Sequence, residues 1–251
     1  MAVTLAYFAY LAAVAVARRR VKPLIVSLLM LVWVFFVGMR SVLPVLYLLA
    51  GYWLPALLVR TSNTPFERSL LAFDRRIFGG HGLDVFVRTA PRAVLEYFEF
   101  AYLLCYAVVP LGFAWLVLTG SEERAGMFWS TVLLASFSCY GLLPWLPTRA
   151  PRAVEPPAPR RLLVVRSLNL LVLDRASVQW NTFPSGHTAA SVAAALAVGS
   201  ASPEAGIALG FVAASIAIGS VVGRYHYAAD AIGGALVAVA AFIMASAAHA
   251  P

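Results

Sequence analysis

The sequence predicts an all-α protein, a polytopic membrane helix bundle of seven or eight spans. Hydrophobic residues make up 62% of the 251 residues and charged residues 12%, against roughly 45–50% and about 25% in soluble globular proteins. The mean hydropathy is +0.84, and several apolar runs approach the roughly 20 residues that cross a bilayer as a helix. The two cysteines, Cys105 and Cys139, both lie inside apolar runs, which excludes a disulfide-stabilised secreted domain.

The amino-terminal part contains one clear span and one ambiguous run. Residues 3–17 are apolar and are followed by four basic residues within 18–22, an order that favours a retained span over a secretory leader. The run 24–59 has 36 residues and includes Arg40 and Pro44. As a helix it would extend about 54 Å at 1.5 Å per residue, too long for one crossing and slightly short for two. It can therefore cross once or twice.

The middle of the chain alternates between polar and apolar segments. Residues 61–91 form the first polar stretch. The spacing of their apolar side chains predicts an amphipathic helix on the membrane surface, ending at Gly79–Gly80. The runs 94–118 and 127–146 are the next two spans, and a short polar turn at 121–124 separates them.

The carboxyl-terminal part begins with the most basic loop and ends in three apolar runs. The loop 148–166 carries five arginines and four prolines, and these prolines preclude a long helix. The runs 188–201, 205–222 and 228–248 are dominated by Ala, Gly, Ser and Val. Small residues let membrane helices pack closely, so we expect these three helices to form the tightest part of the bundle.

The positive charge of the chain is almost entirely arginine. There are 19 basic and 11 acidic residues, a formal charge of +8, and Lys22 is the only lysine. Arginine presents a planar fork of donors that suits phosphate. Anionic lipid headgroups around the loops, or an anionic substrate in a site, can each explain this charge. Nucleic acid is not expected, since the basic residues are divided among short loops.

Three polar clusters border the last spans, at 147–152, 183–188 and 223–230. In the second, the sequence Pro-Ser-Gly-His opens a helix, whose amino terminus offers free N–H groups and a positive dipole end to phosphate. His187 would lie in the first turn, beside the bound anion. The alternative is that Ser185 is only a helix cap and the histidine an interfacial residue.

In the third cluster, His226 and Asp230 are four residues apart. On a helix they would share one face, and the carboxylate could accept a hydrogen bond from the imidazole. The other ring nitrogen would then be free to act as a nucleophile or base. A structural ion pair at the membrane boundary and a zinc site with His187 are the alternatives. Because the nearby arginines attract anions, we expect no bound metal and no cofactor.

Together the clusters provide the groups needed for phosphoryl transfer without metal. Their order resembles the type 2 phosphatidic acid phosphatase superfamily, which also includes vanadium haloperoxidases and inositol phosphorylceramide synthases. The resemblance implies a six-helix core, with residues 1–40 as the amino-terminal span or spans and residues 41–251 as the catalytic membrane domain. It rests on three motifs, each beside a span: the arginine-rich loop, Pro184-Ser185-Gly186-His187, and His226-x-x-x-Asp230.

The resemblance implies a role for each matching residue. His226 would attack phosphorus and become phosphohistidine, Asp230 would orient it, and His187 would protonate the leaving oxygen. The phosphate ligands would be Ser185, Gly186 and either Arg149 or Arg152. Release of the phosphoryl group to water would make the protein a phosphatase of a membrane lipid. Release to an alcohol, such as inositol or a lipid alcohol, would make it a phosphotransferase.

The sequence departs from the family pattern at two places. Leu142 stands seven residues before Arg149, where the first motif has a basic residue. Ser220 stands six residues before His226, where the third motif has an arginine. Arg224 can replace that arginine as a phosphate ligand, although on a helix it would point in a different direction. The loss resembles the inositol phosphorylceramide synthase-like branch and favours transfer to an alcohol.

Two readings of another class stay open, a transporter and a non-catalytic membrane scaffold. Within the span 94–118, Glu96 and Glu99 can pair with loop arginines or bind a polar headgroup, and we favour pairing. Most of the ten tyrosines and six tryptophans are expected in the interfacial belts of the membrane.

The side on which the site lies depends on the number of spans. With eight spans, the basic turn 18–22 and all three clusters fall on one face, which the positive-inside rule places in the cytoplasm. With seven, the run 24–59 crosses once, and the site faces outward while the turn stays inside. The second arrangement agrees with the resemblance. We therefore expect a multi-pass protein of the cell membrane with an outward-facing site.

Overall fold

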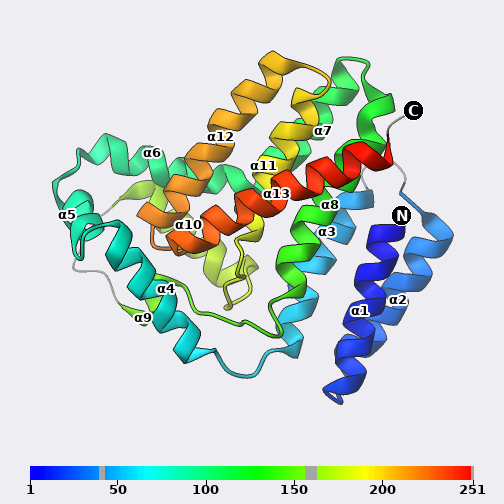
Figure 1. Ribbon diagram of the computed structural model, residues 1–251, viewed down its shortest axis with the longest axis horizontal. Coiled ribbons are helices and arrows are strands. Elements are labelled where there is room, and N and C mark those ends of the chain that lie inside the picture. The colour runs from blue at the N-terminus through cyan, green and yellow to red at the C-terminus, as the bar shows by residue number, and fades with distance from the viewer. Residues whose placement is uncertain (40–42, 156–162, 250–251) are drawn as a thin grey trace.

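Helices form the regular structure of the described residues, apart from one isolated bridge between Thr148 and Asn181. The computed structural model describes residues 1–39, 43–155 and 163–249, and Figure 1 shows their arrangement. The all-α prediction is confirmed. The helices are α1 (Ala2–Ala17), α2 (Val21–Val37), α3 (Leu43–Trp53), η1 (Leu54–Leu58), α4 (Thr64–Ile77), α5 (Gly82–Thr89), α6 (Arg92–Leu103), η2 (Leu104–Tyr106), α7 (Val108–Leu118), η3 (Glu122–Arg124), α8 (Ala125–Gly141), α9 (Pro151–Val154), α10 (Val164–Ala176), α11 (Gly186–Gly199), α12 (Pro203–Val222) and α13 (Ala228–Ala248).

Two of the described helices, α12 and α13, are long and apolar enough to cross a membrane. The segments Arg92–Tyr106 and Val108–Leu118 would make a third span together, and they meet at a bend of 63°. Helices α1, α2 and α11 and the segment Leu43–Leu58 are apolar but shorter. A membrane protein is therefore confirmed, whereas the count of seven or eight spans stays a prediction.

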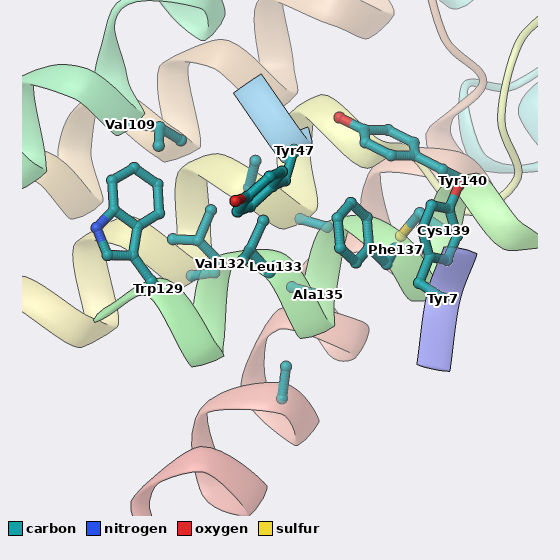
Figure 2. Close-up of a cluster of buried hydrophobic side chains, with 14 of the residues drawn as sticks. Tyr7, Tyr47, Val109, Trp129, Val132, Leu133, Ala135, Phe137, Cys139 and Tyr140 are labelled. Carbon is teal, nitrogen blue, oxygen red and sulfur yellow. The ribbon is translucent and has the colours of Figure 1, made fainter. Parts of the chain in front are cut away.

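The core surrounds α11, which packs against α7, α8, α12 and α13 (Figure 1). Its alanines allow this close approach, and Ala193 and Ala194 are completely buried. The larger core side chains come from α8 and the amino-terminal helices. Phe137 of α8 stacks on Tyr7 of α1 with ring centroids 4.1 Å apart (Figure 2). The domain boundary expected at residue 40 lies outside the described residues, and that division stays a prediction.

Glycines set the spacing between α11 and α12. A Cβ added to Gly206 would overlap the Cα of Gly199 and lie 2.9 Å from its nitrogen, whereas a Cβ at Gly210 would meet nothing within 4 Å. We expect Gly206→Ala to lower the free energy of unfolding by about 1–3 kcal/mol, the usual cost of overpacking. Thermal unfolding in detergent micelles measures this, with Gly210→Ala as the matched control. Equal melting temperatures for the two variants would contradict the close packing.

The polar stretch forms two surface helices, α4 and α5, where the sequence predicts one. Asn63 caps α4 by accepting a hydrogen bond from the N–H of Phe66 at 3.2 Å. The helix ends before Gly79 and Gly80, which both have positive φ angles, as the sequence predicts. In the basic loop, α9 is a single short turn. The prolines and arginines at 156–161 lie outside the described residues.

The basic turn 18–22 lies at the same end of the bundle as the polar clusters. Arg18 donates hydrogen bonds to the carbonyls of Leu58 (2.8 Å) and Pro144 (2.7 Å), just before the first cluster. At the other end, Met1 and Met39 line one pocket with His249. The run 24–59 therefore leads away from the turn as α2 and returns as α3 and η1. Whether this run crosses the membrane once or twice, and which way the site faces, stay predictions.

Candidate active site

The three polar clusters meet at one end of the bundle, where main-chain hydrogen bonds hold them together. They come from the segment after α8, the start of α11 and the connection between α12 and α13. Each bond joins two clusters or their flanking residues: Asn181 N–H to Thr148 O (2.6 Å), Ser185 N–H to Asp230 O (2.9 Å) and Arg152 N–H to Arg224 O (3.2 Å).

His226 and Asp230 form the buried pair that the sequence predicts. His226 Nδ1 lies 3.2 Å from Asp230 Oδ2, and the two residues are 4% and 0% exposed. The geometry differs from the expected one, because α13 begins at Ala228 and His226 precedes it. Asp230 instead closes the first turn, where it also accepts the N–H of Tyr227 at 3.1 Å. The carboxylate thereby holds both the helix start and the imidazole.

His187 lies beside His226, with the two ring centroids 5.9 Å apart. Three tyrosine rings surround it at 5.7–6.0 Å, from Tyr52, Tyr102 and Tyr106. Tyr102 is only 2% exposed, so it belongs to the core and not to the tyrosines of an interfacial belt. These aromatic contacts fix the position of His187 without providing a charged partner.

Both histidines line a cavity of ≈ 70 Å³, together with Arg152. At about 30 Å³ per water molecule, this is the space of roughly two waters, so the enclosed part suits a compact group rather than a lipid chain. The guanidinium of Arg152 lies 5.0 Å from the centre of the Tyr225 ring. Burial, together with the charge of Arg152, lowers the pKa of His226 to about 3. The imidazole is therefore neutral at pH 7.

Arg149 does not line this cavity. Its side-chain Nη2 and Nε donate to the carboxylate of Glu67 at 2.7 and 3.1 Å. Its main-chain N–H donates to the same carboxylate at 2.7 Å. Burial alone would raise the pKa of Glu67, but these bonds hold it below its usual value. Of the two arginines predicted as alternative phosphate ligands, the structure therefore places Arg152 beside the histidines and Arg149 in a structural pair.

Ser185 and Gly186 are committed to internal hydrogen bonds. The hydroxyl of Ser185 accepts the N–H of Thr188 at 3.3 Å and caps α11. The N–H of Gly186 donates to Thr182 Oγ1 at 3.2 Å. A side chain at Gly186 would overlap the ring of Tyr140, which explains why glycine is needed there. Their binding to phosphate stays a prediction.

A buried ion pair supports the connection that carries His226. Arg166 of α10 donates to Glu99 of α6 at 2.7 Å and to the carbonyl of Gly223 at 3.3 Å. The hydroxyl of Tyr225 also donates to Glu99. The pairing prediction for Glu99 is confirmed. Sequence spacing could not show that its partners are Arg166 and Tyr225, because they lie 67 and 126 residues away.

A second and larger cavity, ≈ 510 Å³, reaches His226 from another direction. The short helix α9 contributes to both cavities, because Pro151 lines the larger one and Arg152 the smaller. Arg224 lines the larger cavity and pairs with Asp84 at 3.3 Å and Glu155 at 3.5 Å. It is 8% exposed, and its Nε has no partner among the described residues.

Asp74 of α4 also faces the larger cavity and accepts the N–H of Ala228 at 2.9 Å. Burial raises the pKa of Asp74 to about 6. In this cavity the carboxylates accept hydrogen bonds and the guanidinium groups donate them, as a polar headgroup or polyol requires. Among the described residues, no three His, Cys, Asp or Glu side chains are grouped as a metal site.

A family model described as the PAP2 superfamily matches residues 68–244. The match extends from α4 into α13 and includes all three polar clusters. No curated protein and no solved structure matches the chain.

Proposed function

The chain belongs to the PAP2 superfamily, and from this membership and the geometry of the site we propose that it is a membrane phosphoesterase. Its substrate would be a lipid phosphate or a phospholipid headgroup. The observation that carries the proposal is the buried His226–Asp230 pair beside His187, with Arg152 at the same cavity. Phosphoryl transfer needs a nucleophile with an orienting carboxylate, an acid and an anion-binding cation, all at one place.

The proposed reaction has two displacements at phosphorus. His226 Nε2 attacks, a phosphorus–nitrogen bond forms, and the bond to the lipid oxygen breaks while protonated His187 gives that oxygen a proton. Burial lowers the pKa of His187 to about 3 in the free site, so this step needs the negative charge of the bound phosphate to raise that pKa. Asp230 holds the opposite ring nitrogen, so that Nε2 carries the free electron pair. Water or an alcohol then attacks phosphorus and gives a proton to His187. The phosphorus–nitrogen bond breaks and His226 is restored, with no metal in either step.

An assay with purified protein in liposomes tests the proposal. The substrates are a panel of lipid phosphates and phospholipids, with and without free polyols. Release of inorganic phosphate identifies a phosphatase, and formation of a new phosphoester identifies a phosphotransferase. If no substrate turns over across the panel, the scaffold and transporter readings replace the enzyme.

The second cavity favours phosphotransfer as a second candidate function. In a phosphomonoester only oxygen atoms remain on phosphorus after the lipid leaves. In a phosphodiester the headgroup stays attached to phosphorus in the histidine intermediate and needs space beside His226. The cavity with Asp74, Asp84 and Arg224 offers this space and polar groups to bind a headgroup. Such an enzyme would pass a phospho-headgroup to an alcohol. This is the reaction that the resemblance to inositol phosphorylceramide synthases implies.

Arg224→Gln tests the second candidate. A hydrogen bond to a charged group contributes about 1.5–3 kcal/mol, so we expect at least a roughly tenfold loss of kcat/KM with phosphodiester donors. With a phosphomonoester the loss should be small, because the monoester does not extend into the second cavity. Parallel assays with both substrates measure the ratio. Wild-type turnover of both substrates would exclude Arg224 as a ligand, and equal losses would indicate a structural role.

The face of the membrane is a further part of the proposal. Because the turn 18–22 lies at the site's end of the bundle, the two share one face. The positive-inside rule assigns that face to the cytoplasm, and an outward-facing site, as the resemblance implies, would require an exception to the rule. A reporter fused after Pro251, beyond the far end of α13, separates the two. Activity of the reporter only outside the cell places the site inside, and activity only inside places it outside.

A further inference from the structure

A third cavity, ≈ 510 Å³, lies between the α1–α2 turn, the segment 58–63 and the segment 144–147, and neither His187 nor His226 lines it. Arg18, Arg20 and Arg60 line it, and none of its lining residues is acidic. Neutral polar residues, Ser62 and Asn63 among them, complete the wall. The proposed reaction uses none of these residues. A cavity with three guanidinium groups and no carboxylate selects an anion.

The arginines are held in place but keep donors free. Arg18 donates to two main-chain carbonyls and lies 4.9 Å from the ring centre of Trp145. Arg20 donates to the carbonyl of Leu57 at 2.9 Å. A guanidinium has five N–H donors, so most donors of both side chains stay available to a ligand. Carbonyl bonds also leave the positive charge of each arginine uncompensated.

An apolar stripe leads from this cavity along the outside of the bundle. It lies on α3 and η1, where Leu46, Leu49, Trp53 and Leu57 are each 40–51% exposed. Their spacing places them on one helix face, and that face ends at Leu57, whose carbonyl binds Arg20. Trp145, 54% exposed, stands at the rim, as tryptophan does at a membrane interface.

We propose that this cavity binds the phosphate of an anionic phospholipid whose acyl chains lie along the stripe on α3 and η1. A soluble phosphate would use the arginines but leave the stripe uncovered, whereas a zwitterionic lipid would cover the stripe but bring a cation toward three arginines. Only an anionic lipid satisfies both parts. The site is separate from the catalytic cavity, and the proposal does not depend on the proposed function.

Native mass spectrometry of the purified protein with phosphatidylglycerol or phosphatidylcholine tests the site. We expect stronger retention of phosphatidylglycerol, and a loss of about fivefold per arginine removed, the size of one arginine–lipid attraction. The variants are Arg60→Gln and Arg20→Gln/Arg60→Gln. Arg18 is left intact because its carbonyl bonds join two segments. Arg175→Gln, whose side chain is 77% exposed on α10, is the matched control and should retain the lipid.

Three results would overturn the proposal. Equal retention of the two lipids by the wild-type protein would show that charge is not recognised. If Arg20→Gln/Arg60→Gln retains phosphatidylglycerol as well as the wild-type protein, or if Arg152→Gln loses it instead, the lipid binds elsewhere. Complete displacement by an equal concentration of glycerol phosphate would show that the cavity binds free phosphate and that the stripe contributes nothing.

Discussion

Replacement of His226 with alanine is expected to lower phosphoryl transfer by about 10⁴-fold or more, the scale seen when a nucleophile is removed from a catalytic unit. His226 is buried, paired with a carboxylate and neutral at pH 7. Without it, neither His187 nor Arg152 can form the covalent intermediate. The residual rate would come from substrate binding alone.

The measurement is turnover of the best lipid substrate in liposomes, with phosphate and phosphoester products followed separately. His249→Ala is the matched control, because His249 lies at the far end of α13. A rapid quench of the wild-type protein in alkaline denaturant should also recover phosphohistidine, whose phosphorus–nitrogen bond is labile in acid, and His226→Ala should lack it. Retention of more than a tenth of wild-type turnover in His226→Ala would exclude this histidine as the nucleophile.

The pH profile provides a second test of the same residue. An unperturbed histidine titrates near pH 6.5, and a nucleophile of that pKa would lose activity as the pH falls through 6.5. Burial and the Arg152 charge lower the pKa of His226 to about 3, so its neutral form persists throughout the range from pH 5 to 8. As the pH is lowered from 8 to 5, the single-turnover rate of intermediate formation should therefore show no fall with a midpoint near pH 6.5.

Hydrophobic patterning predicts the carboxyl-terminal helices, and residue spacing predicts the contact between His226 and Asp230. The run 228–248 matches α13, because nothing in it competes with a helix. The four-residue separation of His226 and Asp230 predicts their contact by placing both on one helix face. The contact forms, but the helix begins only after His226. The contact forms because a carboxylate in the first turn reaches back to the preceding main chain and side chain.

Long-range contacts were the part that local patterns could not give. Arg149 and Arg152 stand three residues apart in the same loop, and nothing in that loop distinguishes them. The partner that does so, Glu67, lies 82 residues away in a surface helix. The tyrosines around His187 come from α3, α6 and η2, so the sequence near His187 carries no sign of them. Composition alone assigned them to the membrane interface.

Arg152 is the residue for which this distinction has the largest consequence. Its guanidinium lines the cavity of both histidines, and in the proposed reaction negative charge would develop there on the oxygens of the transferred phosphoryl group. Removing one such donor from a buried site costs about 10²–10³-fold in rate. We expect Arg152→Gln to lower kcat by this factor and to leave the melting temperature close to that of the wild type.

Arg149→Gln is the matched comparison, because it removes the same charge from the same loop. Glu67, whose side chain is only 1% exposed, would lose its guanidinium partner, so the melting temperature should fall while kcat changes little. The two variants are therefore expected to separate catalysis from stability in opposite ways. The reverse pattern, a catalytic loss in Arg149→Gln and none in Arg152→Gln, would show that Arg149 leaves Glu67 to bind the phosphate when substrate enters.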